Sequence, residues 1–233
     1  MLVLIDNADI KEIEMLYNDY PYDGVTTNPT ILRAAGENPV KLLKKIYDLI
    51  PDGCQLHAQL ISESTEKMIE EAHFLLKYIG EDMFIKVPVT KEGMRAIPML
   101  KKEGINITAT AIYTSMQAFM AAKAGARYTA PYVNRIDNMG FDGLQVAKNI
   151  HDMFRVHGLN ADVLAASFKN THQVESLCRY GIGAVTAAPE VLRALIKHDS
   201  TLTAEETFTS DFFKLVNDVE GLHLQKMKET QKD

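Results

Sequence analysis

The chain has 233 residues, of which 46% are hydrophobic and 24% charged, and its formal net charge is −6. This composition excludes long disordered stretches, and the acidic balance with scattered Lys and Arg argues against a nucleic-acid partner. No apolar run reaches membrane-spanning length, so no membrane partner is expected. The two cysteines favour a reducing, cytoplasmic setting, and no Cys/His cluster has the spacing of a metal site.

Short apolar runs alternate with amphipathic stretches through most of the chain. The runs cover residues 2–5, 24–27, 54–61, 83–89, 105–112, 128–133, 162–168 and 184–186. Eight strand–helix units in this length predict a (β/α)8 barrel. An open doubly wound sheet is the alternative, disfavoured because no Gly-rich fingerprint follows the first run.

Helix ends can also be read locally. Ser64 before Thr65 is typical of an N-cap, Thr90 opens the next helix, and Gly104 closes it. No linker or low-complexity block interrupts residues 1–233, so a single domain is expected. Its tail, residues 203–228, predicts one or two helices outside the barrel.

Catalytic groups of such barrels lie at the C-terminal ends of the strands. Seven of the eight predicted strands end on polar or ionisable side chains, and the eighth offers little beyond Thr186. The candidates are Asp6, Thr27, Asn28, Gln59, Lys86, Thr110, Tyr132 with Arg135 just beyond it, and Ser167. A barrel without a site at this end would scatter such residues.

Lys86 carries the most information because it stands in the middle of an apolar strand. A buried lysine has a lowered pKa, which frees its lone pair for attack on a ketone carbonyl. The alternative is a lysine whose ammonium reaches the rim and stays in water. The polar candidates at the same rim favour the nucleophile.

Other candidates also have structural interpretations. Asp6 could accept a proton from a substrate hydroxyl, or it could cap the first helix, a role open equally to Asn7 or Asp9. Asn28 precedes a proline, which is a common turn signal. His57 is more simply a satisfied core histidine than a charge that tunes Lys86.

The remaining candidates suggest how water and an anion are held. Gln59 and Tyr132 could hold a catalytic water, although Tyr132 could instead be a half-buried aromatic residue. Arg135 suits a phosphate or a similar oxyanion because its guanidinium is a planar fork, and Ser167 on the next strand supports this reading over a surface salt bridge.

Four motifs together resemble the small transaldolase family, with the fructose-6-phosphate aldolases as the nearest subgroup. They are residues 24–30 (GVTTNPT), 85–90 (IKVPVT), 130–137 (APYVNRID) and 164–169 (LAASFK), and the likeness runs from residue 2 to about 196. The resemblance implies a class I aldolase barrel that needs no cofactor and acts on a sugar phosphate or a related anionic sugar.

The resemblance also implies residue roles. Lys86 would form the Schiff base and Asp6 would assist proton transfer. Thr110 would help position the water. Asn28, next to Thr27 in the first motif, and Ser167 would hold the hydroxyls of a dihydroxyacetone unit, with Thr27 also at the substrate site, and Arg135 would grip the phosphate.

Two positions divide the family. True transaldolases carry Glu and Phe where this chain has Gln59 and Tyr132, which favours aldol cleavage over transfer to a second aldose. Some relatives act on sulfonated sugars, and Asn170-Thr171-His172 departs from the usual sequence near the expected anion site. A non-catalytic sugar-phosphate sensor is the remote alternative, and a sensor would not need Lys86.

The tail carries apolar residues that a lone helix could not hide, and the resemblance suggests that it packs on a neighbouring subunit of a ring-like homo-oligomer, commonly a decamer. Docking on its own barrel is the alternative. These residues are Phe208, Phe212, Phe213, Leu215, Val216, Val219 and Leu222.

Overall fold

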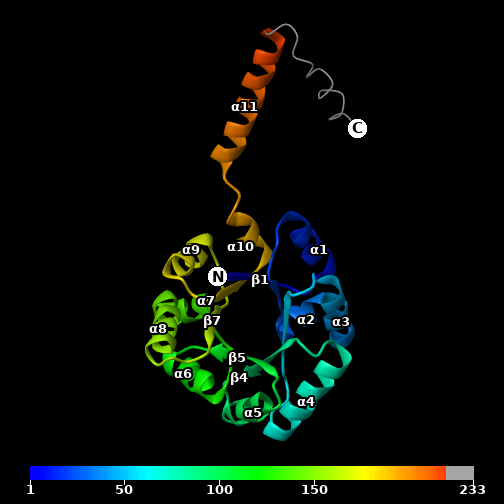
Figure 1. Ribbon diagram of the computed structural model, residues 1–233, viewed down its shortest axis with the longest axis vertical. Coiled ribbons are helices and arrows are strands. Elements are labelled where there is room, and N and C mark those ends of the chain that lie inside the picture. Colours follow the sequence, from blue (N-terminus) through cyan, green and yellow to red (C-terminus); the bar gives the residue numbers. More distant parts are fainter. Residues whose placement is uncertain (219–233) are drawn as a thin grey trace. The chain divides into compact units, whose positions relative to one another are not determined.

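The computed structural model describes residues 1–218 of the chain. Eight parallel strands form a closed barrel in chain order, and β8 returns to pair with β1 (Figure 1). The strands are β1 (Leu2–Asp6), β2 (Gly24–Thr26), β3 (Gln55–Gln59), β4 (Phe84–Pro88), β5 (Asn106–Ile112), β6 (Tyr128–Pro131), β7 (Asp162–Ala165) and β8 (Ala184–Ala187). The predicted (β/α)8 barrel is confirmed.

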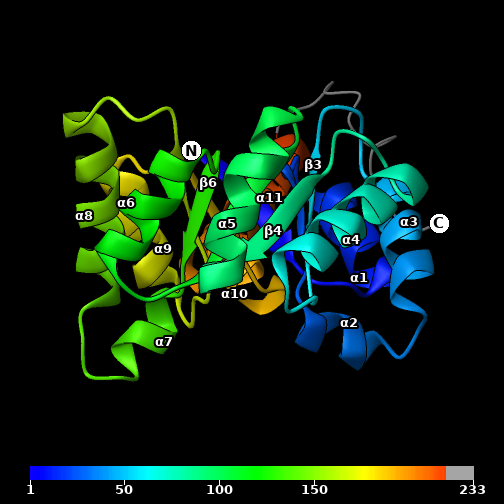
Figure 2. The same ribbon diagram turned by 90° about the horizontal axis from the view of Figure 1, so that it is seen from below.

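Helices fill every connection between successive strands, and a further helix, α10, follows β8. They are α1 (Ile10–Asp19), α2 (Pro29–Ala35), α3 (Pro39–Leu49), α4 (Thr65–Tyr78), α5 (Lys91–Lys102), α6 (Ser115–Ala124), α7 (Val133–Asp137), α8 (Gly143–Val156), α9 (Thr171–Tyr180) and α10 (Pro189–Ala194). Two connections hold a short additional helix, α2 after β2 and α7 after β6. Both lie at the same edge of the barrel in Figure 2, beyond the C-terminal ends of the strands.

Strand ends are where prediction and structure differ. The run at 54–61 contains a strand of five residues, and the runs at 128–133 and 162–168 each contain a strand of four. Leu60 and Phe168 lie beyond the strands yet are buried, at 1% and 9% exposure. Hydrophobicity therefore continues into the rim loops and does not mark where the sheet ends.

The predicted helix ends are confirmed by their hydrogen bonds. The Ser64 hydroxyl accepts from the Lys67 N–H at the start of α4, and the Thr90 hydroxyl accepts from the Gly93 N–H at the start of α5. Gly104 follows α5 with φ +81°, a left-handed conformation that favours glycine.

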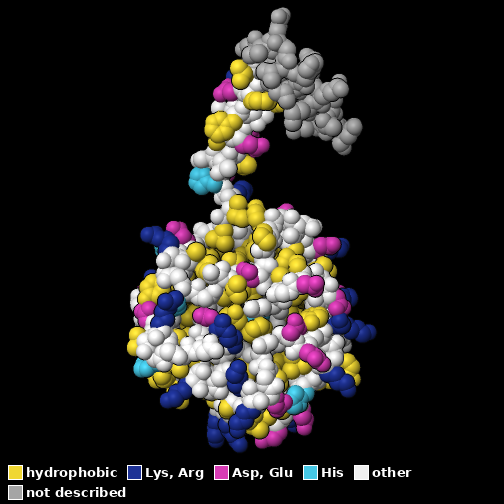
Figure 3. Space-filling view, in the orientation of Figure 1, with side chains coloured by type: hydrophobic (Ala, Val, Ile, Leu, Met, Phe, Trp, Pro, Cys, Tyr) yellow, Lys and Arg dark blue, Asp and Glu magenta, His cyan; other side chains and the backbone are white. Residues whose placement is uncertain are grey.

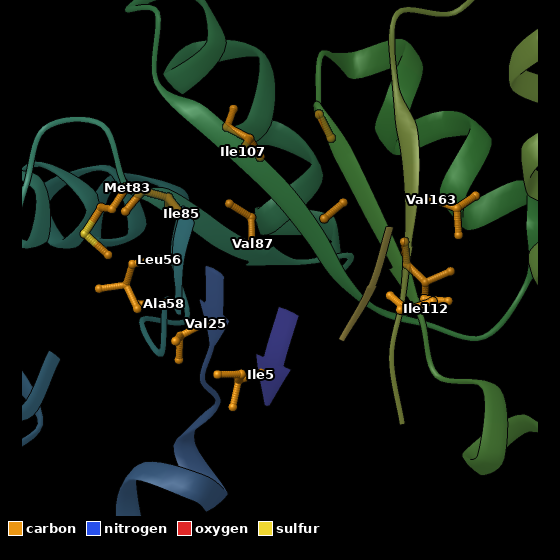
Figure 4. Close-up of a cluster of buried hydrophobic side chains, with 14 of the residues drawn as sticks. Ile5, Val25, Leu56, Ala58, Met83, Ile85, Val87, Ile107, Ile112 and Val163 are labelled. Atoms are coloured by element: carbon orange, nitrogen blue, oxygen red, sulfur yellow. The ribbon is translucent and has the colours of Figure 1, made fainter. Parts of the chain in front are cut away.

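Two buried layers hold the barrel together. Outward-facing strand side chains pack under the helices, and Figure 4 shows Ile5, Val25, Leu56, Ile85 and Val163 among them. A smaller cluster fills the barrel interior at the opposite end from α2 and α7, formed by Leu4, Phe84, Tyr128, Leu164 and Ala184. The polar candidates lie nearer the C-terminal ends of the strands than this cluster does. Every second residue of a strand faces inward, so one strand can supply an apolar residue to the cluster and a polar residue to the rim.

The chain divides into two compact units, residues 1–192 and the segment that begins at Arg193. The second unit contains α11 (Asp199–Asp218), the predicted tail helix, which starts four residues earlier than expected. Apolar side chains are exposed along it (Figure 3), with Phe208 at 72% and Leu215 at 55% exposure. The rest of the predicted tail, including Val219 and Leu222, lies outside the described residues.

Within residues 1–218, no helix combines the length and the apolarity that a bilayer crossing requires.

Candidate active site

A cavity of about 250 Å³ opens at the C-terminal end of the barrel. Six of the nine predicted site residues line it: Asp6, Asn28, Lys86, Tyr132, Arg135 and Ser167. A larger cavity of about 530 Å³ includes Gln59, Pro88 and Lys91 but none of these six. The ionisable groups, rather than cavity size, identify the smaller cavity as the candidate site.

Lys86 is held inside the barrel, as its place in an apolar strand predicts. Its side chain is 5% exposed, and its Nζ donates a hydrogen bond of 2.7 Å to the carbonyl oxygen of Thr27. Burial lowers the Lys86 pKa, and the nearby Asp6 carboxylate opposes that change. The result is an amine that loses its proton more readily than an exposed lysine, which a nucleophile requires.

Asp6 closes β1 and faces the same cavity. The Thr26 hydroxyl donates to its Oδ1 over 2.7 Å. Burial raises the Asp6 pKa, while Lys86, the Thr26 hydrogen bond and Arg135 each act to lower it. Because the pKa of Lys86 falls while that of Asp6 rises, the two values approach each other, which suits proton transfer between substrate and protein.

The capping alternative for Asp6 is wrong. Asp9 is the N-cap of α1, where its Oδ1 accepts from the backbone N–H groups of Lys11 and Glu12. Asn7 uses its side-chain oxygen on the N–H groups of Ala8 and Asp9. The side chain of Asp6 is therefore not needed to cap α1.

For Asn28, the structural interpretation is correct, and the residue also lies in the site. Its Oδ1 caps α2 by accepting from the N–H groups of Thr30 and Ile31, at 3.0 and 3.1 Å. The same side chain lines the cavity. The cap fixes the oxygen, so the amide NH2 is the part of Asn28 suited to a substrate hydroxyl.

Thr27 acts through its backbone rather than its side chain. It is fully buried, and its hydroxyl donates to the carbonyl oxygen of His57 at 3.2 Å, away from the cavity. Its own carbonyl oxygen holds Lys86. Thr27 thus positions the lysine but does not line the space where a substrate would lie.

Of the three residues predicted to hold the catalytic water, two lie close together and the third does not. The hydroxyls of Thr110 and Tyr132 lie 3.0 Å apart, within hydrogen-bonding distance. Gln59 lines two neighbouring cavities instead of the one with Lys86. A bulge in β5 beyond Ala109 places Thr110 at this point, and Ala111 has a positive φ of 58°.

Arg135 and Ser167 both line the cavity. Arg135 is exposed on α7, and its guanidinium lies over the Tyr132 ring at 4.5 Å from the ring centre. Ser167 has a φ of 62°, which is strained for a residue with a side chain, and its carbonyl oxygen accepts from the Asn134 N–H at 2.7 Å. This bond ties α7, and with it Arg135, to the end of β7.

His57 is a satisfied core histidine, as expected. Its Nδ1 lies 2.9 Å from the Thr108 hydroxyl and its Nε2 lies 3.0 Å from Gln55 Oε1, while its ring stacks on Phe84. Because an amide oxygen only accepts, Nε2 carries the hydrogen. Burial, and secondarily Lys86, holds the His57 pKa well below its ordinary value, so the ring is neutral.

Sequence reasoning missed two residues near Asp6. These residues are Thr26 and Thr186. Thr26 was passed over for its neighbour Thr27, and Thr186 was judged uninformative. The available signal was alternation, which puts Asp6, Thr26 and Thr186 on the inward face at or next to the end of their strands. Their meeting depends on the stagger between strands, which a single sequence does not reveal.

Comparison with known proteins shows the family to which the chain belongs. The sequence profile described as "Transaldolase/Fructose-6-phosphate aldolase" matches residues 3–233. A protein of Streptococcus pneumoniae (strain ATCC 700669 / Spain 23F-1) named "Probable fructose-6-phosphate aldolase" is 39% identical over 218 residues, which is 93% of this chain and 98% of that protein. The chain is thus an enzyme of the transaldolase/fructose-6-phosphate aldolase family.

Proposed function

We propose that this protein is a Schiff-base aldolase. It cleaves a ketose phosphate such as fructose 6-phosphate into dihydroxyacetone and an aldehyde such as glyceraldehyde 3-phosphate, or runs that reaction in reverse. The single observation that carries this proposal is the buried Lys86 amine in a cavity shared with the Asp6 carboxylate. A lysine with a lowered pKa and an adjacent acid–base group is the minimum that imine chemistry needs.

The proposed reaction needs no reactant other than the ketose and water. Lys86 Nζ attacks the ketone carbon, and loss of water gives an iminium ion. Asp6 then takes the proton of the hydroxyl on C4, the C3–C4 bond breaks, the aldehyde leaves, and the electron pair passes into an enamine. Protonation of C3 and hydrolysis of the imine release dihydroxyacetone and restore the amine.

The other residues position the substrate in this scheme. Asn28 and Ser167 hold the hydroxyls of the three-carbon unit, and Arg135 holds the terminal anion at the outer end of the cavity. Tyr132, hydrogen-bonded to Thr110, handles the catalytic water. Gln59 orients that water only if its side chain turns from the neighbouring cavities toward Tyr132.

Two related activities are alternatives. A true transaldolase would pass the three-carbon unit to a second aldose, and a relative acting on 6-deoxy-6-sulfofructose would hold a sulfonate at Arg135. A panel separates them: fructose 6-phosphate and its sulfonated analogue, each with and without an acceptor aldehyde. Product formation without an acceptor indicates cleavage, and an absolute need for an acceptor indicates transfer. A sugar-phosphate sensor would bind without turnover.

The decisive test traps the imine. Borohydride added with fructose 6-phosphate or dihydroxyacetone should attach a reduced three-carbon fragment to Lys86, located by peptide mass spectrometry. Lys86→Ala should abolish both labelling and turnover. The matched control is Lys91→Ala, which removes the exposed lysine at the start of α5 and should change neither. Labelling of Lys91 or Lys169 instead would overturn the assignment.

We also propose that α11 packs on a neighbouring subunit, in a homo-oligomer for which a decamer is the expected size. The support is the exposed apolar surface of α11, including Phe208, Phe212 and Leu215. A cytoplasmic location remains a prediction from the two free cysteines, Cys54 and Cys178.

A further inference from the structure

Two buried threonines connect Asp6 to the strand on its other side. In the barrel, β1 lies between β2 and β8, with Thr26 opposite Asp6 and Thr186 opposite Leu4. The Thr26 hydroxyl lies 2.7 Å from Asp6 Oδ1 and also 2.7 Å from the Thr186 hydroxyl. Thr26 is fully buried and Thr186 is 2% exposed, so water does not reach this chain of hydroxyls.

Proton counting gives the chain a direction. Each threonine hydroxyl has one hydrogen, and an ionised carboxylate only accepts. Thr26 donates its hydrogen to Asp6, so the bond between the two threonines must be donated by Thr186. The order is therefore Thr186 to Thr26 to Asp6.

The reverse order is less favourable. If a protonated Asp6 donated to Thr26, and Thr26 to Thr186, the Thr186 hydrogen would need an acceptor. Within residues 1–218 the side chain of Thr186 has no hydrogen-bond partner other than Thr26. A buried donor without an acceptor is costly, so the hydrogen-bonded hydroxyls of Thr186 and Thr26 favour the carboxylate form of Asp6.

We propose that Thr186 is a positioning residue for the aldol reaction, which through Thr26 holds Asp6 in one orientation and in its proton-accepting form. This inference rests on the role proposed above for Asp6. Thr186 itself does not line the cavity and touches no reacting atom.

The charges around Asp6 make such help necessary. Burial alone raises the Asp6 pKa, and the groups that counter it are Lys86, Thr26 and Arg135. The Lys86 nitrogen is neutral when it attacks the substrate and positively charged again in the iminium ion, so its effect on Asp6 changes during the reaction, and Arg135 is exposed to screening. The hydroxyl chain keeps its effect throughout the reaction because it is uncharged and dry.

The test is a double-mutant cycle on retro-aldol cleavage of fructose 6-phosphate by the full-length enzyme. Thr186→Val keeps the shape and removes the hydroxyl, and we expect kcat to fall about three- to tenfold, as for loss of one neutral hydrogen bond, with KM within twofold. The acidic limb of the kcat/KM profile should move to higher pH. Thr186→Ser should restore wild-type behaviour.

The cycle separates positioning from general damage. In the Thr26→Val background, Thr186→Val should have no further effect on kcat, because the path to Asp6 is already broken. Thr129→Val is the matched control: Thr129 is a fully buried strand threonine whose hydroxyl has no partner within residues 1–218, and its loss should leave kcat and the pH profile unchanged. If Thr186→Val does not fold, Thr186→Ala serves in its place.

The outcomes also distinguish this inference from the proposed function. Borohydride labelling of Lys86 should persist in Thr186→Val, since imine formation does not need Asp6 as base. The role of Thr186 would be overturned if the wild-type enzyme cleaves fructose 6-phosphate and Thr186→Val has the same kcat. It would also be overturned if the effects of Thr186→Val and Thr26→Val on kcat add. A wild-type enzyme that neither labels at Lys86 nor cleaves the sugar would overturn the proposed function itself.

Discussion

At the scale of single residues, the acid–base role proposed for Tyr132 leads to a test of cleavage against transfer. Its hydroxyl lies 3.0 Å from Thr110, whereas Gln59 can orient water but cannot move a proton. We predict that Tyr132→Phe lowers aldol cleavage at least about tenfold, roughly 1.4 kcal/mol in barrier, and lowers transfer to an acceptor aldehyde less. Release of dihydroxyacetone, measured with and without acceptor, checks this. Unchanged cleavage would show that another group moves the proton.

The burial of His57 leads to a prediction about stability rather than rate. Its folded pKa lies well below its ordinary value of 6.5 because the ring is buried beside Lys86. A base with a lowered folded pKa contributes stability above its unfolded pKa and loses it as pH falls toward the folded value. The unfolding free energy should therefore drop below about pH 6.5, by up to about 1.4 kcal/mol per pH unit for one group.

Urea titrations between pH 7.5 and 5 would measure this slope. His57→Gln should flatten it, although the variant also loses the stacking of His57 on Phe84 and so starts from lower stability. His151, whose pKa burial also lowers, is the matched control, and His151→Gln should remove a smaller part of the slope. A slope that survives unchanged in His57→Gln would contradict the assignment.

At the scale of elements, Asn28 joins a helix cap to the active site. Asn28→Ala should cost about 1 kcal/mol of stability through loss of the cap, and should also lower activity. Asn28→Asp keeps the capping oxygen but loses the amide donor, so it should keep the stability and lose activity. The control is Asn38→Ala, which removes the exposed N-cap of α3 and should lower stability alone.

Thermal unfolding and steady-state kinetics on these three variants separate the two roles. An Asn28→Asp variant with full activity would mean that the amide does not touch the substrate. The comparison is informative because α2 and its cap lie at the rim that carries the cavity (Figure 2).

At the scale of the whole molecule, we predict assembly through α11. Sedimentation of the wild-type protein at micromolar concentration should show a species much larger than 26.1 kDa. Phe208→Glu combined with Phe212→Glu should reduce it toward the monomer, because two charges cannot be buried in an apolar interface without partners. Val156→Glu changes an exposed apolar residue at the end of α8 and should leave the assembly intact. A wild-type monomer would refute the proposal.

The sequence by itself determined the barrel, the strand order and most of the rim. Eight apolar runs separated by helical spacing leave few ways to bury both faces of each strand, and parallel strands bring their C-terminal ends to one edge. Lys86 and Asp6 could therefore be chosen by type and place. Helix caps such as Ser64 and Thr90 were readable because capping acts over three residues.

Tertiary structure alone decided which rim residues share a cavity. Strand stagger sets whether Thr26 faces Asp6, a bulge sets where Thr110 points, and strain at Ser167 fixes the approach of α7. These depend on contacts between residues far apart in the chain, as in the 160-residue separation of Thr26 and Thr186. Alternation along a strand gives the face on which a side chain lies but not its partner, because the partner is set by the closure of the whole barrel.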